Sequence, residues 1–355
     1  MAFNLAAPVN SLGYGVVGLN VVLALERLGH DPALWPIGEV EAPEEHHAVL
    51  SRALARRQGF DPRAPSLRIA NAAALAERMG RGLHGGLPVF ELNRMSAVEL
   101  QQLHAIDVVF VASGWARRVL AENGIPEARV KVAPFGVDPE IFPYCDRVEP
   151  GTTVFLNVGK WEVRKGHDVL AEAFGKAFTP ADDVRLELLP GSPFSTAEES
   201  RQWADAYFDS ALAQKVRILE RLPTQRDVAA VMARADCGVF PYRAEGWNLG
   251  LSEMLAMGKT VIATDYSAPT EYLSPENARL IEIDRLEDAV DGKWFHGEGQ
   301  WAELGDAQVD QLVEHMRAVH RLKRSGQLRP NAAGRDTMAR FTWGATVRRI
   351  ADGLA

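Results

Sequence analysis

The sequence contains few cysteines, no long apolar run and no excess of positive charge. Its two cysteines, Cys145 and Cys237, lie far apart, which excludes a disulfide scaffold and a CxxC motif. No apolar run reaches the roughly 18 residues of a transmembrane helix. The N-terminus lacks the basic region of a signal peptide, so we expect a cytoplasmic protein. The net charge of −8 argues against nucleic-acid binding by bulk charge, although an acidic protein can still carry a local basic surface.

What is present is the composition of an ordinary folded protein. Hydrophobic residues make up 47% and charged residues 24% of the 355 residues, which is typical of soluble globular chains and excludes a disordered one. At roughly 100–200 residues per domain, this length predicts two domains.

Both halves of the chain alternate short apolar runs with amphipathic segments, a pattern typical of parallel α/β sheets. In the first half we expect strands over 3–9, 87–92, 107–113 and 130–134, helices over 16–28 and 115–123, and helical or irregular structure over 40–80. A linker rich in proline and glycine covers 134–151. Beyond it we expect strands over 153–158, 184–189, 216–219, 237–240 and 260–264, and helices over 168–178, 196–214, 225–235, 251–256 and 342–354.

This pattern predicts two doubly wound, Rossmann-like domains that face each other across a cleft. We expect domains over 1–143 and 144–340, and a C-terminal helix within 341–355 that could pack back on the first domain. Ligands of such sheets bind at the loops that follow the carboxyl ends of the strands.

The most informative of these loops carries two glutamates, Glu245 and Glu253, with seven residues between them. Ionised carboxylates accept several hydrogen bonds at once, which suits sugar hydroxyls. The backbone N–H groups at the start of the helix that follows suit an anion such as a diphosphate. Two surface glutamates, one of them complementing the helix dipole, would show the same spacing.

The run EGWNLGLSEMLAMGKTVIATD resembles the Glu-x7-Glu signature of the family 4 retaining glycosyltransferases, which use nucleotide sugars and have the GT-B fold. FLNVGKWEVRKGHDVLAEAF, VKVAPFGVDPEIF, TEYL and FTWGATVRRI resemble further segments of that family. The resemblance implies an acceptor-side domain over 1–143, a nucleotide-sugar domain over 144–340, and a UDP- or GDP-sugar donor. It implies no required cofactor. The chain contains no Asp-x-Asp pair, in agreement with a site that uses no metal.

The resemblance also implies roles for particular residues of the donor site. Glu245 would meet the hydroxyls of the donor sugar, and Glu253 the ribose hydroxyls of the nucleotide. Lys160 and Lys165 would clamp the diphosphate, and the neighbouring Arg164 could share that role. The family usually has arginine at the first clamp position, so Lys160 supplies a point charge where relatives have a bidentate fork. The remaining contacts would come from the backbone of Asn248, Leu249 and Gly250, and from Arg221 and Leu222 at the nucleobase.

In the first domain, Gly13 and Gly15 lie on the first strand-to-helix turn, where glycine allows close approach of a diphosphate. With Gly18 they nearly complete G-x-G-x-x-G, which raises the alternative of an NAD-dependent oxidoreductase. No acidic residue stands at an expected strand end near position 35, where the sequence reads Leu34-Trp35-Pro36, and this argues against that alternative. On the acceptor side we expect Glu91, Asn93 and Ser113.

The acceptor is open between two hypotheses. One is a sugar hydroxyl of a cell-envelope polysaccharide or a lipid-linked sugar, with peripheral membrane contact through an arginine-rich segment. The other is a hydroxymethylated base in DNA, as for glucosyltransferases of phage type, whose phosphates the same arginines would track. The arginines in question are Arg52, Arg56, Arg57, Arg63 and Arg68, joined for DNA by Arg78, Arg81 and Arg94.

Overall fold

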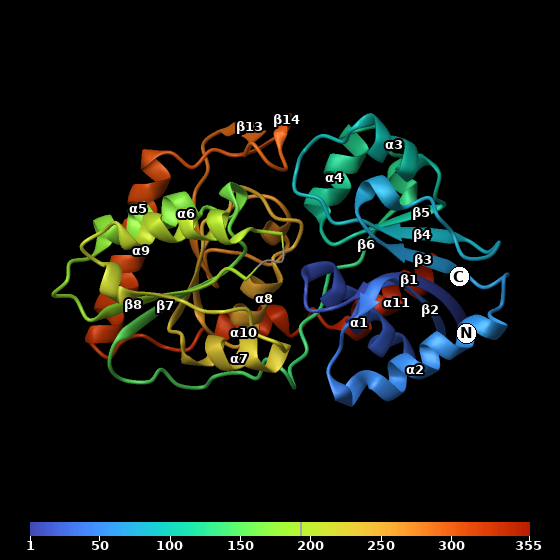
Figure 1. The fold of residues 1–355 in the computed structure, drawn as a ribbon, viewed down its shortest axis with the longest axis horizontal. Helices are drawn as coiled ribbons and strands as arrows, with labels where there is room; N and C mark the ends of the chain where they lie inside the picture. Colours follow the sequence, from blue (N-terminus) through green and yellow to red (C-terminus); the bar gives the residue numbers. More distant parts are fainter. Residues whose placement is uncertain (192–193) are drawn as a thin grey trace. The chain divides into compact units, whose positions relative to one another are not determined.

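The computed structural model describes residues 1–191 and 194–355, which divide into two compact units (Figure 1). Unit 1 combines Met1–Asp138 with Phe341–Ala355, and unit 2 is the continuous stretch Pro139–Arg340. The chain therefore leaves the first unit a few residues before the expected boundary at 143. Among the described residues, no helix combines the length and the apolar character that crossing a membrane requires.

Unit 1 is built on a six-stranded sheet in the order β2-β1-β3-β4-β5-β6, in which every pairing is parallel. Its strands are β1 (Ala2–Val9), β2 (Asp31–Val40), β3 (Ser66–Ile69), β4 (His84–Leu87), β5 (Val108–Val111) and β6 (Val130–Val132). Its helices are α1 (Gly13–Arg27), α2 (His47–Ala55), α3 (Ala97–His104), α4 (Gly114–Glu122) and α11 (Trp343–Gly353).

Four features of unit 1 differ from the expectation, and one of them is helix α3, for which no element was expected. Strand β2 was not expected, and residues 40–80 contain strand β3 as well as helix α2. The strand expected over 87–92 lies earlier, at β4. The sequence did not indicate this position because His84-Gly85-Gly86-Leu87 is not an apolar run. Those glycines are required by packing: a Cβ at Gly85 would lie 2.8 Å from the ring of Phe110.

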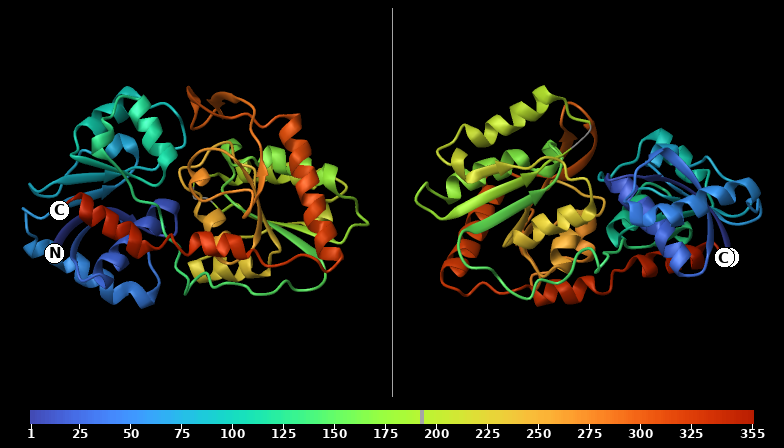
Figure 2. Two further views of the ribbon diagram at one scale, coloured as in Figure 1. Left: turned by 180° about the vertical axis from the view of Figure 1, so that it is seen from behind. Right: turned by 60° about the horizontal axis from the view of Figure 1, so that its bottom comes forward.

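Helix α11 comes from the far end of the chain and completes unit 1 (Figure 2). The Trp343 ring stacks on Phe135 with 5.8 Å between centroids. The Thr346 hydroxyl donates a hydrogen bond of 2.5 Å to the carbonyl of Pro134. Gly136 lies so close to this helix that a Cβ there would be 2.1 Å from the Trp343 nitrogen, so only glycine fits.

Unit 2 repeats the architecture with a six-stranded parallel sheet in the order β12-β11-β10-β7-β8-β9. Its strands are β7 (Thr153–Val158), β8 (Val184–Leu189), β9 (Val216–Ile218), β10 (Cys237–Phe240), β11 (Thr260–Thr264) and β12 (Arg279–Ile281). Its helices are α5 (His167–Ala177), α6 (Ala197–Phe208), α7 (Gln225–Arg234), α8 (Leu249–Ala256), α9 (Asp306–Arg324) and α10 (Ala332–Met338). The two parallel, helix-flanked sheets confirm the expected fold class.

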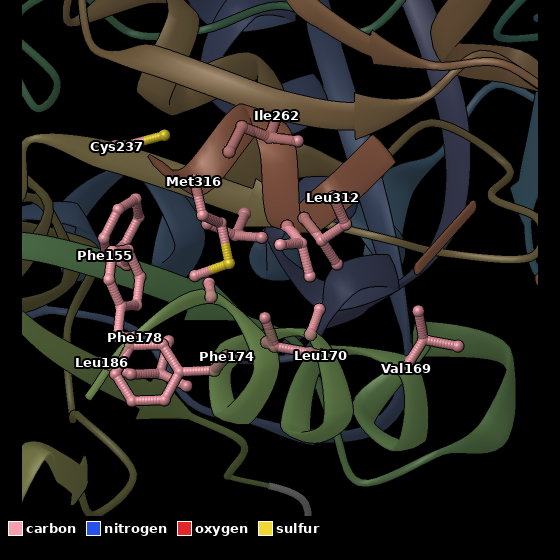
Figure 3. Packing of buried hydrophobic residues seen from close by; sticks show 14 of the residues in the cluster. Phe155, Val169, Leu170, Phe174, Phe178, Leu186, Cys237, Ile262, Leu312 and Met316 are labelled. Atoms are coloured by element: carbon pink, nitrogen blue, oxygen red, sulfur yellow. The ribbon is translucent and has the colours of Figure 1, made fainter. Parts of the chain in front are cut away.

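The main core of unit 2 forms where helices α5 and α9 pack against the sheet (Figure 3). Leu170 and Phe174 of α5 lie in one cluster with Met316 of α9, and all three are at most 2% exposed. The central strands are buried on both faces, which is why they read as continuous apolar runs in the sequence. A separate antiparallel hairpin, β13 (Leu286–Val290) with β14 (His296–Ala302), was not expected.

Candidate active site

The carboxyl edge of the unit 2 sheet brings together the loops that follow β7, β10 and β11. The loop after β7 reaches the loop after β10 at Gly166, whose φ is +71°. A Cβ at Gly166 would lie 1.8 Å from the carbonyl oxygen of Pro241. Glycine at this position therefore allows Lys165, the residue before it, to approach the first glutamate of the Glu-x7-Glu motif.

Glu245 is buried in that approach, with a 4% exposed fraction, and it carries two ion pairs. Its Oε1 lies 2.5 Å from Lys165 Nζ, and its Oε2 lies 3.1 Å from Arg164 Nη1. The Glu245 backbone N–H donates to the hydroxyl of Ser267 at 2.8 Å. Ser267 has φ +62° and ψ −150°, a strained conformation for a residue other than glycine, and such strain is often found at functional sites.

The two remaining basic residues expected at the site are linked by Glu162. Arg164 is buried and donates from Nη2 to Glu162 Oε2 at 2.7 Å, so its guanidinium is shared between Glu162 and Glu245. Lys160 is more exposed, and its Nζ lies 3.5 Å from Glu162 Oε1. Burial raises the pKa of Glu162, but Arg164 and the lysines outweigh it and hold the pKa below its ordinary value.

Glu253, the second glutamate of the motif, lies in α8 and is 6% exposed. Within residues 1–191 and 194–355 we find no hydrogen-bond or ion-pair partner for its carboxyl group. Burial raises the pKa of Glu253 to about 8. The two glutamates thus differ: Glu245 is paired with cations, whereas burial of Glu253 favours its protonated form.

Asn248 caps helix α8, the helix that carries Glu253, and its side chain also contacts Glu245. Its φ is +68°, its Oδ1 accepts from the Leu251 N–H at 3.2 Å, and its Nδ2 lies 3.4 Å from Glu245 Oε1. The N–H groups of Leu249 and Gly250 begin the helix, before any intrahelical partner is available to them. The cap therefore places donors for an anion beside the Glu245 carboxylate.

The glycines of the first turn in unit 1 have different constraints. A Cβ at Gly15 would lie 2.1 Å from the Asn10 side-chain oxygen, so glycine is required there by the turn itself. A Cβ at Gly13 would meet nothing within 4 Å, so packing leaves this position open. The Asn10 side chain accepts from the Leu12 N–H at 3.0 Å and shapes the turn.

The residues expected on the acceptor side lie at the carboxyl edge of the unit 1 sheet. Ser113 is fully buried and caps helix α4, since its hydroxyl accepts from the Ala116 N–H at 3.1 Å. The backbone carbonyl of Asn93 accepts from the Asn123 side chain at 3.0 Å. Glu91 lies in the same loop and is half-buried.

Arg221, expected at the nucleobase, is exposed on the loop after β9, and Leu222 is half-buried. A Cβ at Gly191 would lie 2.8 Å from the Arg221 Cβ, so the two loops are in close contact. Of the eight arginines considered for phosphate or membrane contact, four are paired with carboxylates of the described residues. The pairs are Arg52 and Arg56 with Glu26, Arg56 with Asp31, Arg68 with Glu77, and Arg78 with Asp107.

Sequence reasoning did not identify two parts of this site. One is Glu162; the alternation of charges in Lys160-Trp161-Glu162-Val163-Arg164-Lys165 was a signal that could have found it. The other is Arg243, two residues before Glu245, which binds both carboxylate oxygens of Asp168 at 3.0 and 2.8 Å. Arg243 also donates to Glu287 at 3.1 Å, which fastens the β13–β14 hairpin to the site loops.

Two further observations concern metal binding and the position of a nearby pocket. In the described part of the chain, no group of three or more His, Cys, Asp or Glu side chains is placed to hold a metal ion. A pocket of about 230 Å³ lies beside Asp236 and Thr260, which stand at the amino ends of β10 and β11. Because that is the opposite edge of the sheet from Glu245, the pocket is separate from the candidate site.

Comparison with known proteins finds solved structures of similar fold. Solved structures similar over 99% of this chain include a glycosyltransferase from Rickettsia africae (15% identity, TM-score 0.70, 97% of that chain) and a sucrose-phosphate synthase from Thermosynechococcus elongatus (15%, 0.71, 98%). HepE from Anabaena, solved in complex with UDP-glucose, is similar to the same extent (15%, 0.68, 98%). A search of curated proteins with the sequence found no significant match.

The two parallel sheets and these structural similarities define a protein of the GT-B fold. Residues 152–292 match the family model of group 1 glycosyl transferases, a range that includes both glutamates and both lysines. The chain therefore contains a group 1 glycosyltransferase domain, and it is a glycosyltransferase.

Proposed function

We propose that the protein transfers a sugar from a nucleotide-diphosphate sugar to a hydroxyl acceptor, with retention of the anomeric configuration and without a metal. The observation that supports this most directly is the pair of buried glutamates on either side of the α8 N-terminus, with Lys165 in contact with the first. The three groups match the sugar, the diphosphate and the ribose of one extended donor.

The donor roles follow from the chemistry of each group. Glu245 would accept hydrogen bonds from hydroxyls of the donor sugar. Glu253 would accept them from the ribose hydroxyls, which would stabilise the ionised form of its buried carboxylate. Lys160 and Lys165, together with the backbone N–H groups of Leu249 and Gly250, would hold the diphosphate. Arg164 would act through the carboxylates that it holds. The nucleobase would lie at Arg221 and Leu222.

Catalysis would then rest mainly on electrostatic stabilisation. As the bond to the anomeric carbon breaks, negative charge grows on the leaving nucleoside diphosphate, where the lysines and helix N–H groups stabilise it. The acceptor hydroxyl would attack from the same face, and an oxygen of the diphosphate would take its proton. Such a route explains retention without an enzymic nucleophile.

We propose a glycan or glycolipid hydroxyl as the acceptor, bound on the side of Glu91, Asn93 and Ser113 of unit 1, while Gly13 and Gly15 would leave room for a diphosphate at the first turn. Binding to DNA is less well supported, because several of the arginines that would track its phosphates are already paired with carboxylates. A DNA-binding assay at low and moderate salt, with a liposome-binding assay beside it, compares the two acceptors directly.

A thermal-shift screen tests the donor assignment. Nucleoside diphosphates and their sugars should raise the melting temperature, because a ligand at about 100 times its dissociation constant stabilises by roughly 2.7 kcal/mol. The matching nucleosides, which lack the diphosphate, should stabilise much less. Equal shifts for UDP and uridine, for GDP and guanosine, and for ADP and adenosine would contradict the diphosphate site.

A further inference from the structure

Five charged side chains of unit 2 form an alternating series of ion pairs, which we call the charge chain. Lys160 Nζ lies 3.5 Å from Glu162 Oε1, and Arg164 Nη2 lies 2.7 Å from Glu162 Oε2. Arg164 Nη1 lies 3.1 Å from Glu245 Oε2, and Lys165 Nζ lies 2.5 Å from Glu245 Oε1. Positive and negative groups therefore alternate, and a lysine stands at each end.

Exposure is graded along the charge chain. The side chain of Lys160 is 35% exposed and that of Lys165 is 16% exposed, whereas the three groups between them are 11% exposed or less. An anion that arrives from solvent can therefore reach the lysines, but not the Arg164 guanidinium between the two carboxylates. The five groups carry three positive and two negative charges, which leaves one net positive charge.

Each lysine consequently has a carboxylate of its own protein as counter-ion. A diphosphate that binds Lys160 must compete with Glu162 for the same ammonium group. Glu162 stays ionised throughout, because Arg164, which is always charged, holds its other oxygen. Because the pKa of Glu162 is lowered, protonation near neutral pH does not remove its competition with the diphosphate for Lys160.

We propose that Glu162 is a resident counter-ion of Lys160, which competes with the diphosphate and thereby promotes release of the nucleoside diphosphate after transfer. The inference rests on the proposed function, in which Lys160 binds the diphosphate. When the product leaves, Lys160 returns to Glu162 and is not left without a partner. The pair lowers the affinity for the product without contacting the nucleoside.

The variant Glu162→Gln tests this directly, because the amide keeps the size of the side chain and an oxygen for Arg164, but removes the charge. Binding of UDP, inorganic pyrophosphate and uridine is measured by calorimetry, with circular dichroism as a check on folding. We expect UDP and pyrophosphate to bind about threefold more tightly or better, because Lys160, which loses its counter-ion, is partly exposed, and we expect uridine binding to be unchanged. UDP dissociation in stopped flow should slow by the same factor.

Glu172→Gln is the matched control, since Glu172 pairs with Lys176 at 2.7 Å on the exposed face of α5. It removes one negative charge from unit 2 at a place remote from the proposed chemistry, and UDP binding should not change. The proposal is overturned if Glu162→Gln leaves UDP and pyrophosphate binding unchanged, weakens it, or changes uridine binding equally. If the wild type itself binds neither UDP nor pyrophosphate, the diphosphate site of the proposed function fails as well.

Discussion

At the carboxyl edge of the unit 1 sheet, Tyr14 and Ser113 bond to backbone groups, whereas the same edge of unit 2 also holds a set of charged side chains that bond to one another. The Tyr14 hydroxyl donates to the Val89 carbonyl at 2.8 Å, and Ser113 caps a helix. In unit 2, by contrast, Arg164 joins two carboxylates. Groups of the first kind stabilise loops, while a buried set of charges is costly unless it is balanced, and such sets are frequent at functional sites.

The variant Glu245→Gln should show the largest effect on turnover. A small effect would contradict the view that the charged side chains of unit 2 form the functional edge. Loss of the charge removes a group that orients the sugar and favours positive charge at the anomeric carbon, so turnover of the sugar donor should fall about 10²–10³-fold. Binding of free UDP, which has no sugar, should not weaken. Steady-state rates and calorimetry measure the two. Wild-type turnover would reject the catalytic role, and equal losses in both would mean that sugar and nucleotide are placed the wrong way round.

The second largest effect should come from Glu253→Gln, in UDP binding. A charge-assisted hydrogen bond contributes roughly 1.5–3 kcal/mol, so affinity should fall about tenfold or more. Because the ionised carboxylate accepts the ribose hydroxyls, the wild type should bind UDP more tightly as pH rises through about 8, where Glu253 ionises. The Gln variant should lack this part of the pH dependence, and identical profiles would contradict the assignment.

Although Glu253→Gln should weaken UDP binding, it should increase the free energy of unfolding at high pH. The pKa of Glu253 is raised from 4.5 to about 8, so the folded state binds more protons than the unfolded state between those values. The free energy of unfolding of the wild type therefore falls as pH rises through this window. Glu253→Gln removes the penalty, and at pH 9 the variant should be more stable by at least about 1 kcal/mol. Denaturant unfolding at pH 5 and pH 9 measures the difference.

A smaller effect is expected from Ser113→Ala in unit 1. Loss of the helix cap should lower the free energy of unfolding by about 1 kcal/mol. UDP affinity should stay at the wild-type value, because Ser113 is proposed on the acceptor side and UDP belongs to the donor. A fall in UDP affinity without a fall in stability would show that the two edges are not divided in the way proposed.

The smallest effect is expected from removal of metal ions. If Lys160, Lys165 and the start of α8 stabilise the leaving diphosphate, transfer should proceed at the same rate in EDTA. Magnesium and manganese added back serve as controls. Loss of activity in EDTA that either ion restores would assign the diphosphate to a cation and leave the lysines without their proposed role.

The two units also differ in how well their folds can be predicted from sequence. The strands expected over 153–158, 184–189, 237–240 and 260–264 are β7, β8, β10 and β11 to the residue. Most of their residues are buried and apolar, so each strand stands out in the sequence, although Asn157 interrupts β7 and Arg185 and Glu187 interrupt β8. Strand β2 of unit 1 was missed because Pro32, Pro36 and Gly38 interrupt it. Prolines are tolerated there because β2 is the edge strand of its sheet.

For the site, sequence indicates which residues carry the chemistry but not how they are paired. Lys160, Lys165, Glu245 and Glu253 were found because their types and spacing match a known motif. The bonds of Arg164 to Glu245 join positions about eighty residues apart, and only the folded loops bring them together. The burial of Glu253 likewise depends on packing around α8, so its raised pKa has no counterpart in the sequence.

The divided course of unit 1 has a consequence for synthesis on the ribosome. Its first stretch, Met1–Asp138, emerges before any of unit 2, but α11 emerges only after all of Pro139–Arg340. Until then the Phe135 ring and the narrow surface at Gly136 have no Trp343 to cover them. Unit 2 is continuous and can complete its core first. Unit 1 can therefore be completed only after α11 is made, and a nascent chain stalled before Phe341 would leave the Phe135 ring without its Trp343 partner.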